Sequence, residues 1–199
     1  MTQIKRVLGL DPGLSTFGWA LLRRRKKIKN MCLDVGLFES KPDKKLVYYD
    51  DYYRRLSLLQ TWLTDVVRTT APEAIAVEAF SYPRQARAAV YLAGSHSVAR
   101  SVAESFDIPI IQIKRSYVLS VAGVQVVGKG RAARRKSIKE GVIAFCNEHW
   151  GDLENWPNAK TRREHPADAA ATAYTLLTNY ALQHRLFEDP LPDLICSFE

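Results

Sequence analysis

IKRVLGLDPGLSTFGWALL, residues 4–22 of this 199-residue chain, contains two short apolar runs separated by a turn. The first run is Ile4–Leu10, and the Asp11-Pro12-Gly13 sequence after it is a turn signal. The second run is Phe17–Leu22, and Met31–Phe38 (MCLDVGLF) follows it after a basic segment that suits a hairpin tip. We therefore expect three successive strands in an antiparallel meander.

After this meander the pattern changes to alternating helices and strands. Apolar residues between Leu46 and Val67 recur every three or four positions, which predicts an amphipathic helix that ends at Ala71-Pro72. Two further apolar runs, Ala74–Val77 (AIAV) and Ile108–Ile113 (IPIIQI), predict strands. Other helices are expected over Arg84–Phe106, Ser116–Ala122, about Ile138–Trp150 and Pro166 to about His184, with a glycine- and lysine-rich loop over Gln125–Arg135 and an irregular segment over Gly151–Arg163.

This order of elements predicts an α/β protein with a mixed five-stranded sheet flanked by helices. Three antiparallel strands lie beside parallel strands that crossover helices connect. It is the order of strands and helices in the RNase H-like fold. The length fits one domain, which we place at residues 1–184, followed by a C-terminal tail of unassigned role at residues 185–199.

The composition is that of a globular protein with a surplus of basic residues. Lysine and arginine number 29 against 21 aspartate and glutamate, and the resulting net charge of +8 favours a polyanionic partner such as nucleic acid. The three cysteines are widely spaced, so we expect neither a disulfide framework nor a CxxC metal site. No apolar run is long enough for a transmembrane helix or a signal peptide, which predicts a cytoplasmic protein without membrane insertion.

Three acidic residues stand at the ends of predicted elements. Asp11 follows the first strand and Glu78 the fourth, so parallel pairing of these strands would bring both carboxylates to one edge of the sheet. His165 and Asp168, three residues apart, share one face of the last helix. Alone, Asp11 is also explained as a turn residue, and Asp168 as a first-turn acid that complements the helix dipole. Together, on a basic protein, they favour a nuclease site in which two cations about 3.5–4 Å apart act on a phosphodiester.

Three motifs resemble the RuvC family of Holliday-junction resolvases. They are GLDPGLSTFGWA, IAVEAF and HPADAAATAY, and the resemblance extends over about residues 4–174. It implies a homodimeric, metal-dependent endonuclease that places symmetric nicks in four-way junction DNA. It also implies that Asp11, Glu78, His165 and Asp168 are the catalytic and metal-binding residues, with two Mg²⁺ or Mn²⁺ ions per site. Imidazole suits manganese better than magnesium, so His165 leaves the choice of metal open. Glu164 next to it is an alternative oxygen ligand, which also leaves this choice open.

The same resemblance suggests which residues contact DNA. The family has an aromatic residue just after its catalytic glutamate, and Phe80 matches it, although a core position would also explain Phe80. A family lysine shortly after the fifth strand is missing here, so Lys114 or Arg115 supplies the charge. A second family lysine matches Lys136, in a basic run that is either a set of phosphate contacts or a solvated charged face. The DNA contacts that we expect are Phe80, Tyr82, Arg84, Arg87, Lys114, Arg115, Lys129, Arg131, Arg134, Arg135, Lys136, Lys160, Arg162 and Arg163.

Two other functions are compatible with these residues. One is another RNase H-like nuclease that acts on RNA or on flapped or branched DNA, since a fold does not fix a substrate. The other is a catalytically inactive junction-binding protein, against which the clustered acids argue. We expect the homodimer to form through the small-residue helix around Ala89–Ala103. A branch-migration helicase as a further partner is not readable from the sequence.

Overall fold

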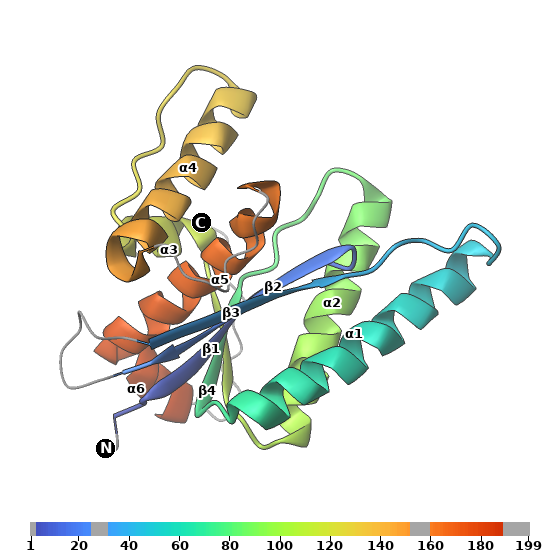
Figure 1. The fold of residues 1–199 in the computed structure, drawn as a ribbon, viewed down its shortest axis with the longest axis horizontal. Coiled ribbons are helices and arrows are strands. Elements are labelled where there is room, and N and C mark those ends of the chain that lie inside the picture. Colours follow the sequence, from blue (N-terminus) through green and yellow to red (C-terminus); the bar gives the residue numbers. More distant parts are fainter. Residues whose placement is uncertain (1–2, 25–31, 152–159, 189–199) are drawn as a thin grey trace.

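The computed structural model describes residues 3–24, 32–151 and 160–188, and in these segments a single mixed sheet has five strands (Figure 1). Their order is β3-β2-β1-β4-β5, with β1 antiparallel to β2 and parallel to β4. The predicted mixed sheet is confirmed. β1 and β4 are parallel neighbours, so residues that follow the two strands lie at the same edge of the sheet. The strands are β1 (Arg6–Asp11), β2 (Thr16–Arg23), β3 (Cys32–Glu39), β4 (Ala74–Glu78) and β5 (Ile110–Ile113).

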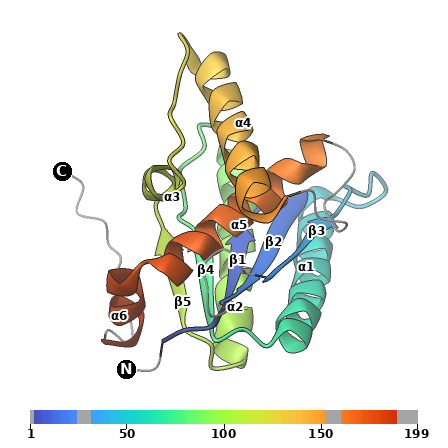
Figure 2. The same cartoon turned by 60° about the vertical axis from the view of Figure 1, so that its left-hand side comes forward.

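Helices cover both faces of this sheet. They are α1 (Tyr48–Thr70), α2 (Ala86–Ser105), α3 (Arg115–Val121), α4 (Arg131–Trp150), α5 (Lys160–Thr178) and α6 (Tyr180–Glu188). α1 and α2 lie on one face, to the right of the sheet in Figure 1, and α5 lies on the other with α3, α4 and α6 around it (Figure 2). Side chains of β1 alternate between the two cores, since Leu8 and Leu10 pack with α1 and α2 whereas Val7 packs with α5.

Two glycines allow α5 to lie directly on the sheet. Gly9 of β1 and Gly18 of β2 face this helix, and a Cβ atom at either position would overlap backbone atoms of Ala169 or His165, respectively. A helix so close to the strands has room mainly for small side chains, and the buried residues of α5 include Ala167, Ala169, Ala170, Ala171 and Ala173. The close approach places His165 at the end of β1, next to Asp11.

Two helices begin earlier than the sequence predicts. The loop expected over Gln125–Arg135 ends at Gly130, whose φ of 85° suits glycine, so the basic run lies on α4. The expectation that Pro166 is a first helical position is wrong, because α5 begins at Lys160. The proline ring removes the helical hydrogen bond to the carbonyl of Arg162, a loss that the packing of the following turns on the sheet outweighs. Asp168 therefore lies in the helix interior, where interaction with the helix dipole at the first turn does not explain an acidic residue.

The single helix expected to run to about His184 is two helices. Asn179 ends α5 and caps α6, because its side-chain oxygen accepts the backbone N–H of Leu182. α6 extends to Glu188 and buries Leu186 in the core on the α5 face. The domain boundary expected at residue 184 thus falls inside α6, and residues 189–199 lie outside the described part of the chain.

The other predicted elements begin and end within two residues of those observed. In α2, Ala99 and Ala103 are buried with α1 and the sheet, and Gly94 lies against Tyr52 of α1. Much of the small-residue surface of α2 therefore packs within the chain. Of the helices described, none has the length and apolar character needed to cross a bilayer.

Candidate metal and DNA site

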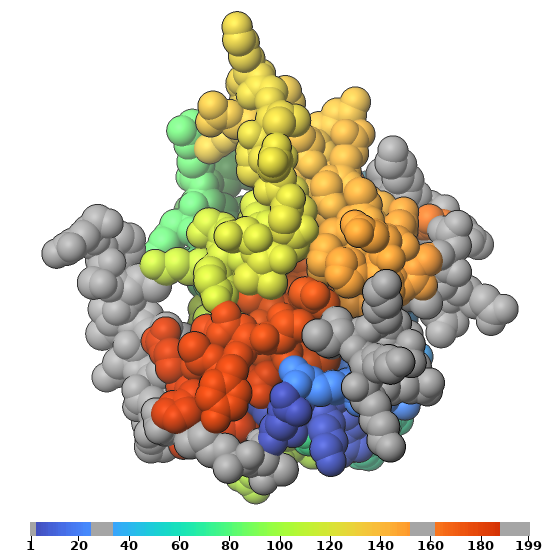
Figure 3. All heavy atoms as spheres, turned by 90° about the vertical axis from the view of Figure 1, so that its left-hand side faces the viewer, coloured from blue at the N-terminus to red at the C-terminus, as the bar shows by residue number. Residues whose placement is uncertain are grey.

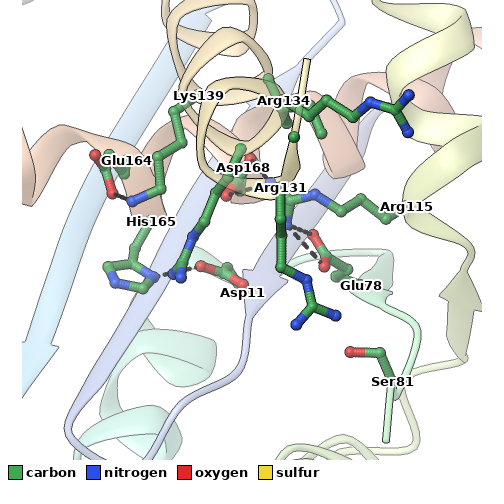
Figure 4. Close-up of a pocket in the computed structure, with 13 residues that line it drawn as sticks. Asp11, Glu78, Ser81, Arg115, Arg131, Arg134, Lys139, Glu164, His165 and Asp168 are labelled. Carbon is green, nitrogen blue, oxygen red and sulfur yellow. Dashed lines mark hydrogen bonds and ion pairs between the residues drawn. The ribbon is translucent and has the colours of Figure 1, made fainter. Parts of the chain in front are cut away.

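Three carboxylates meet at one edge of the sheet. Asp11 ends β1 and Glu78 ends β4, and the parallel register that pairs Leu10 with Val77 brings the two acids side by side. Asp168 reaches the same point from α5. One oxygen of each acid lies within 4.8 Å of the others (Figure 4). Asp11 and Glu78 are 67 positions apart in the chain, and Glu78 and Asp168 are 90 apart, yet the three acids form one candidate cation site.

Poor solvation makes the negative charge of these acids costly. Side-chain exposure is 16% for Glu78 and 14% for Asp168. Burial raises the pKa of Glu78 to about 7, where Arg115 opposes the shift and Asp11 adds to it. Burial and the charge of Asp11 raise the pKa of Asp168 to about 6. A bound cation would relieve both effects, and a ligand set made only of oxygen atoms suits hard divalent ions such as Mg²⁺ and Mn²⁺.

His165 lies beside Asp11 and is not one of the three converging ligands. Its Nδ1 is 2.5 Å from Oδ2 of Asp11. Burial alone would lower the pKa of His165, but the hydrogen bond with Asp11 and the charges of Asp11 and Asp168 raise the pKa above its usual value. Asp11 therefore has a partner that orients its carboxylate and, when protonated, offsets its charge.

Arg115 fills the space between the other two acids. It is the first residue of α3 and follows β5, which pairs with β4. Its Nη1 donates to both oxygens of Glu78 at 2.9 Å, and its Nη2 donates to both oxygens of Asp168 at 3.1 Å. Of the two residues considered for the missing family lysine, Arg115 faces the acids, whereas Lys114 is an exposed N-cap residue.

Glu164 points away from the acids, toward α4. Its carboxylate pairs with the ammonium of Lys139, which ties α5 to α4. The alternative in which Glu164 is an oxygen ligand is not the arrangement in this structure. Lys139 is therefore paired with the residue next to His165.

The acids line a cleft of about 930 Å³ whose other wall is basic (Figure 4). Four cations of α4 line it, namely Arg131, Arg134, Arg135 and Lys139. Ser81, in the loop after β4, also lines the cleft, and its position three residues after Glu78 is the only signal for it in the sequence. In Figure 3, which shows the side formed by α3, α4 and α5, the loop before α4 (yellow) projects beyond the rest of the molecule. Carboxylates opposite arginines suit a phosphodiester held between cations.

Residues at the start of α5 lie outside this cleft. Arg162 pairs with Glu39 at the end of β3 over 3.2 Å, because α5 crosses the sheet and its first turns pass beyond β1 and β2. Arg163 does not line the cleft, and of Lys160 only the backbone is described. Of these three predicted DNA contacts, Arg162 thus lies against β3 and not in the cleft.

Three other predicted DNA contacts do not line the cleft. Lys136 lies on a neighbouring surface of α4 with Glu140, and Lys129 is exposed in the loop before that helix. Arg87 turns toward α1, where its guanidinium lies 4.4 Å from the ring centroid of Tyr48. The structure thus gives Arg87 a packing role between helices.

The loop after β4 carries an aromatic pair. The rings of Phe80 and Tyr82 are 4.8 Å apart and nearly perpendicular. Phe80 is half-buried and its ring also lies 5.6 Å from that of His96, whereas Tyr82 is 83% exposed. Arg84 is exposed in the same loop. Tyr82 and Arg84 are therefore the members of this group that are open to a partner.

The sequence matches a known family over most of its length. The sequence model described as crossover junction endodeoxyribonuclease RuvC matches residues 7–147. The RuvC protein of Methylorubrum populi is 29% identical over 175 residues, which cover 88% of this chain and 81% of that protein. The RuvC protein of Syntrophomonas wolfei is 28% identical over 178 residues, which cover 89% and 91%. The matched range includes Asp11 and Glu78 and ends before Asp168, whose place in the site comes from the geometry.

Solved structures share the fold. Thermus thermophilus RuvC superposes with a TM-score of 0.64 at 21% identity, over 91% of this chain and 96% of that one. The same protein in complex with a Holliday junction substrate gives 0.63 at 18% identity, over 92% and 96%. The yeast mitochondrial Holliday junction resolvase Ydc2 gives 0.57 at 16% identity, over 94% and 82%. The predicted RNase H-like fold is confirmed, and with the family model matched over residues 7–147 the chain belongs to the crossover junction endodeoxyribonuclease RuvC family.

Proposed function

We propose that the protein is a metal-dependent endonuclease that resolves four-way DNA junctions by paired symmetric nicks. The observation that carries this proposal is the meeting of Asp11, Glu78 and Asp168 in a cleft walled by arginines of α4. Three poorly solvated carboxylates that repel one another would serve no purpose in a protein that only binds junctions. We therefore favour cleavage over binding alone.

The acids, His165 and the arginines of α4 each have a role in this reaction. Asp11, Glu78 and Asp168 would hold two Mg²⁺ or Mn²⁺ ions, which when bound activate water and offset the charge of the phosphodiester. His165 orients Asp11 through Nδ1, and in its neutral form with Nδ1 protonated its Nε2 is free to accept a proton. The arginines of α4 bind phosphate oxygens and keep the DNA backbone opposite the acids.

Cleavage of a mobile four-way junction, with and without divalent metal, tests the function directly. We expect paired symmetric nicks that require Mg²⁺ or Mn²⁺ and stop when EDTA is added. Single nicks confined to flapped DNA, or cleavage of RNA, would assign the chain to another class of RNase H-like nuclease. Tight junction binding without cleavage in either metal would contradict the catalytic assignment.

Two nicks in opposed strands require two active sites related by a two-fold axis, so we propose a homodimer. The exposed residues of α2, which include Ala86, Val90, Ala93 and Ser97, remain our candidate contact surface. We expect light scattering at micromolar concentration to give twice the mass of one chain. The mass of one chain, both with and without junction DNA, would contradict the dimer.

Removal of two α4 arginines should weaken junction binding and flatten its dependence on salt. Each phosphate contact contributes about 0.9 to the slope of log K against log salt on duplex DNA, so we expect Arg134→Gln with Arg135→Gln to lower the slope by about 2. The control is Arg68→Gln, which removes a charge from an exposed ion pair of α1, on the opposite face of the sheet from α5, and should leave the slope unchanged. A slope that is equal in the double variant and wild type would assign both arginines to a solvated surface.

A further inference from the structure

Arg115 differs from the other cations of the cleft because it is already bound to the acids. Its guanidinium donates to all four carboxylate oxygens of Glu78 and Asp168, at 2.9 and 3.1 Å. Asp11, the third acid, has His165 as its partner. Each of the three candidate metal ligands therefore has a cationic or titratable side chain of this protein in contact with it.

The geometry of Arg115 suits a contact that can be made and released. Its backbone is fixed, because the carbonyl of Lys114 accepts the N–H groups of Tyr117 and Val118 in the first turn of α3. Its side chain is long and 36% exposed, and it lines the open cleft. A lysine in its place would be a point charge, whereas the planar fork of arginine binds two carboxylates at once.

We propose that Arg115 is an internal cation that competes with divalent metal for Glu78 and Asp168, and that metal loading moves its guanidinium off these carboxylates into the cleft. Without metal, Arg115 keeps two repelling acids together in the place where they are needed. With metal, the same carboxylate oxygens bind the divalent cation in place of the guanidinium. The inference rests on the proposed function only in taking Glu78 and Asp168 as metal ligands.

Metal binding without DNA measures this competition. Isothermal titration of the full chain with Mn²⁺ would compare wild type with Arg115→Gln, which removes the charge and the fork. Because bound metal must replace charge-assisted hydrogen bonds, which are among the strong ones in proteins, we expect the variant to bind Mn²⁺ at least about tenfold more tightly. Arg115→Lys should fall between the two.

A matched control separates competition from a simple change of charge. Arg131 is an arginine of the same cleft that donates no hydrogen bond to Glu78 or Asp168 in the described structure. Arg131→Gln removes the same charge, and we expect its Mn²⁺ affinity to stay within about twofold of wild type, as for charges across an open, solvated cleft. Equal affinities for Arg115→Gln and Arg131→Gln, or weaker binding by Arg115→Gln, would overturn the proposal.

The wild-type protein provides an independent test. Side-chain ¹⁵N NMR resolves arginine Nε and Nη groups, and the Arg115 signals are those lost in the Arg115→Lys or Arg115→Gln spectrum. On saturation with diamagnetic Mg²⁺ we expect these signals to shift and the Nη groups to rotate faster, since they lose their carboxylate partners. Arg115 signals that do not change at Mg²⁺ saturation would contradict displacement.

The outcomes also distinguish this inference from the proposed function. Wild-type protein that binds Mg²⁺ with movement of Arg115, but never cleaves junctions, would contradict the function and leave the competition standing. Protein that cleaves junctions while Arg115 stays on Glu78 and Asp168 would contradict the competition alone.

Discussion

Asp11→Asn and Glu78→Gln are each expected to lower the rate of junction cleavage at least about 1,000-fold, a loss of about 4 kcal/mol of transition-state stabilisation. Each change keeps the shape of the side chain and removes the charge that would hold metal. Junction affinity should change little, because it comes mainly from phosphate contacts to the basic side chains of the cleft. Single-turnover cleavage rates and binding isotherms on the same junction measure the two effects separately.

A surface acid provides the control for these variants. Asp65 of α1 is exposed and pairs with Arg68 on the opposite face of the sheet from α5, so Asp65→Asn should cleave at the wild-type rate. Near wild-type cleavage by Asp11→Asn or Glu78→Gln would show that the metal-site assignment is wrong. A parallel loss of affinity would indicate that these carboxylates act in folding or DNA binding.

His165→Asp is expected to shift the metal preference from manganese toward magnesium. Nε2 of His165 is the ring atom not bonded to Asp11 and could serve as a fourth ligand. For that role we expect manganese to support cleavage by the wild-type protein at least as well as magnesium, because manganese accepts an imidazole more readily. The substitution replaces nitrogen with carboxylate oxygen beside Asp11, and we expect the ratio of the rates in Mg²⁺ and Mn²⁺ to rise at least about tenfold. Rates measured in each metal at saturation give this ratio.

His165→Asn separates metal ligation from proton transfer. Its amide keeps an N–H donor near Asp11 but cannot take up a proton, so we expect about a 100-fold loss in both metals. The wild-type rate should rise with pH through the pKa of His165, which lies above the usual value of about 6.5, because only the neutral ring accepts a proton. That limb should be absent in His165→Asn. Variants that equal wild type in both metals and at all pH values would limit the site to Asp11, Glu78 and Asp168.

The strand order and the meeting of the acids follow from local patterns in the sequence. Apolar runs that end at Asp11 and Glu78 indicate where the strands stop, and parallel pairing of β1 with β4 then places both acids at one edge. The start of α5 could not be predicted in this way, because tertiary packing on Gly9 and Gly18 sustains the helix across Pro166.

The contacts of Arg115 with the two acids could not be predicted from the sequence pattern either. A basic residue after the fifth strand is consistent with a phosphate contact or with an ion pair. Arg115 pairs with Glu78 and Asp168 because β5 lies beside β4 and α5 crosses the sheet at the same edge. Contacts among three segments far apart in the chain have no local signature.

The contact between Gly18 and the backbone of His165 has a consequence for how the enzyme can be damaged. Gly18 pairs with Asp11 across β1 and β2 and carries no functional group of its own. Any side chain there would lift α5 and carry His165 and Asp168 away, while Asp11 and Glu78 stay on their strands. A residue that takes no part in the chemistry thus sets the spacing between the two halves of the active site. Substitution of Gly18 would therefore lower activity as loss of a metal ligand does, although Gly18 contacts neither metal nor DNA.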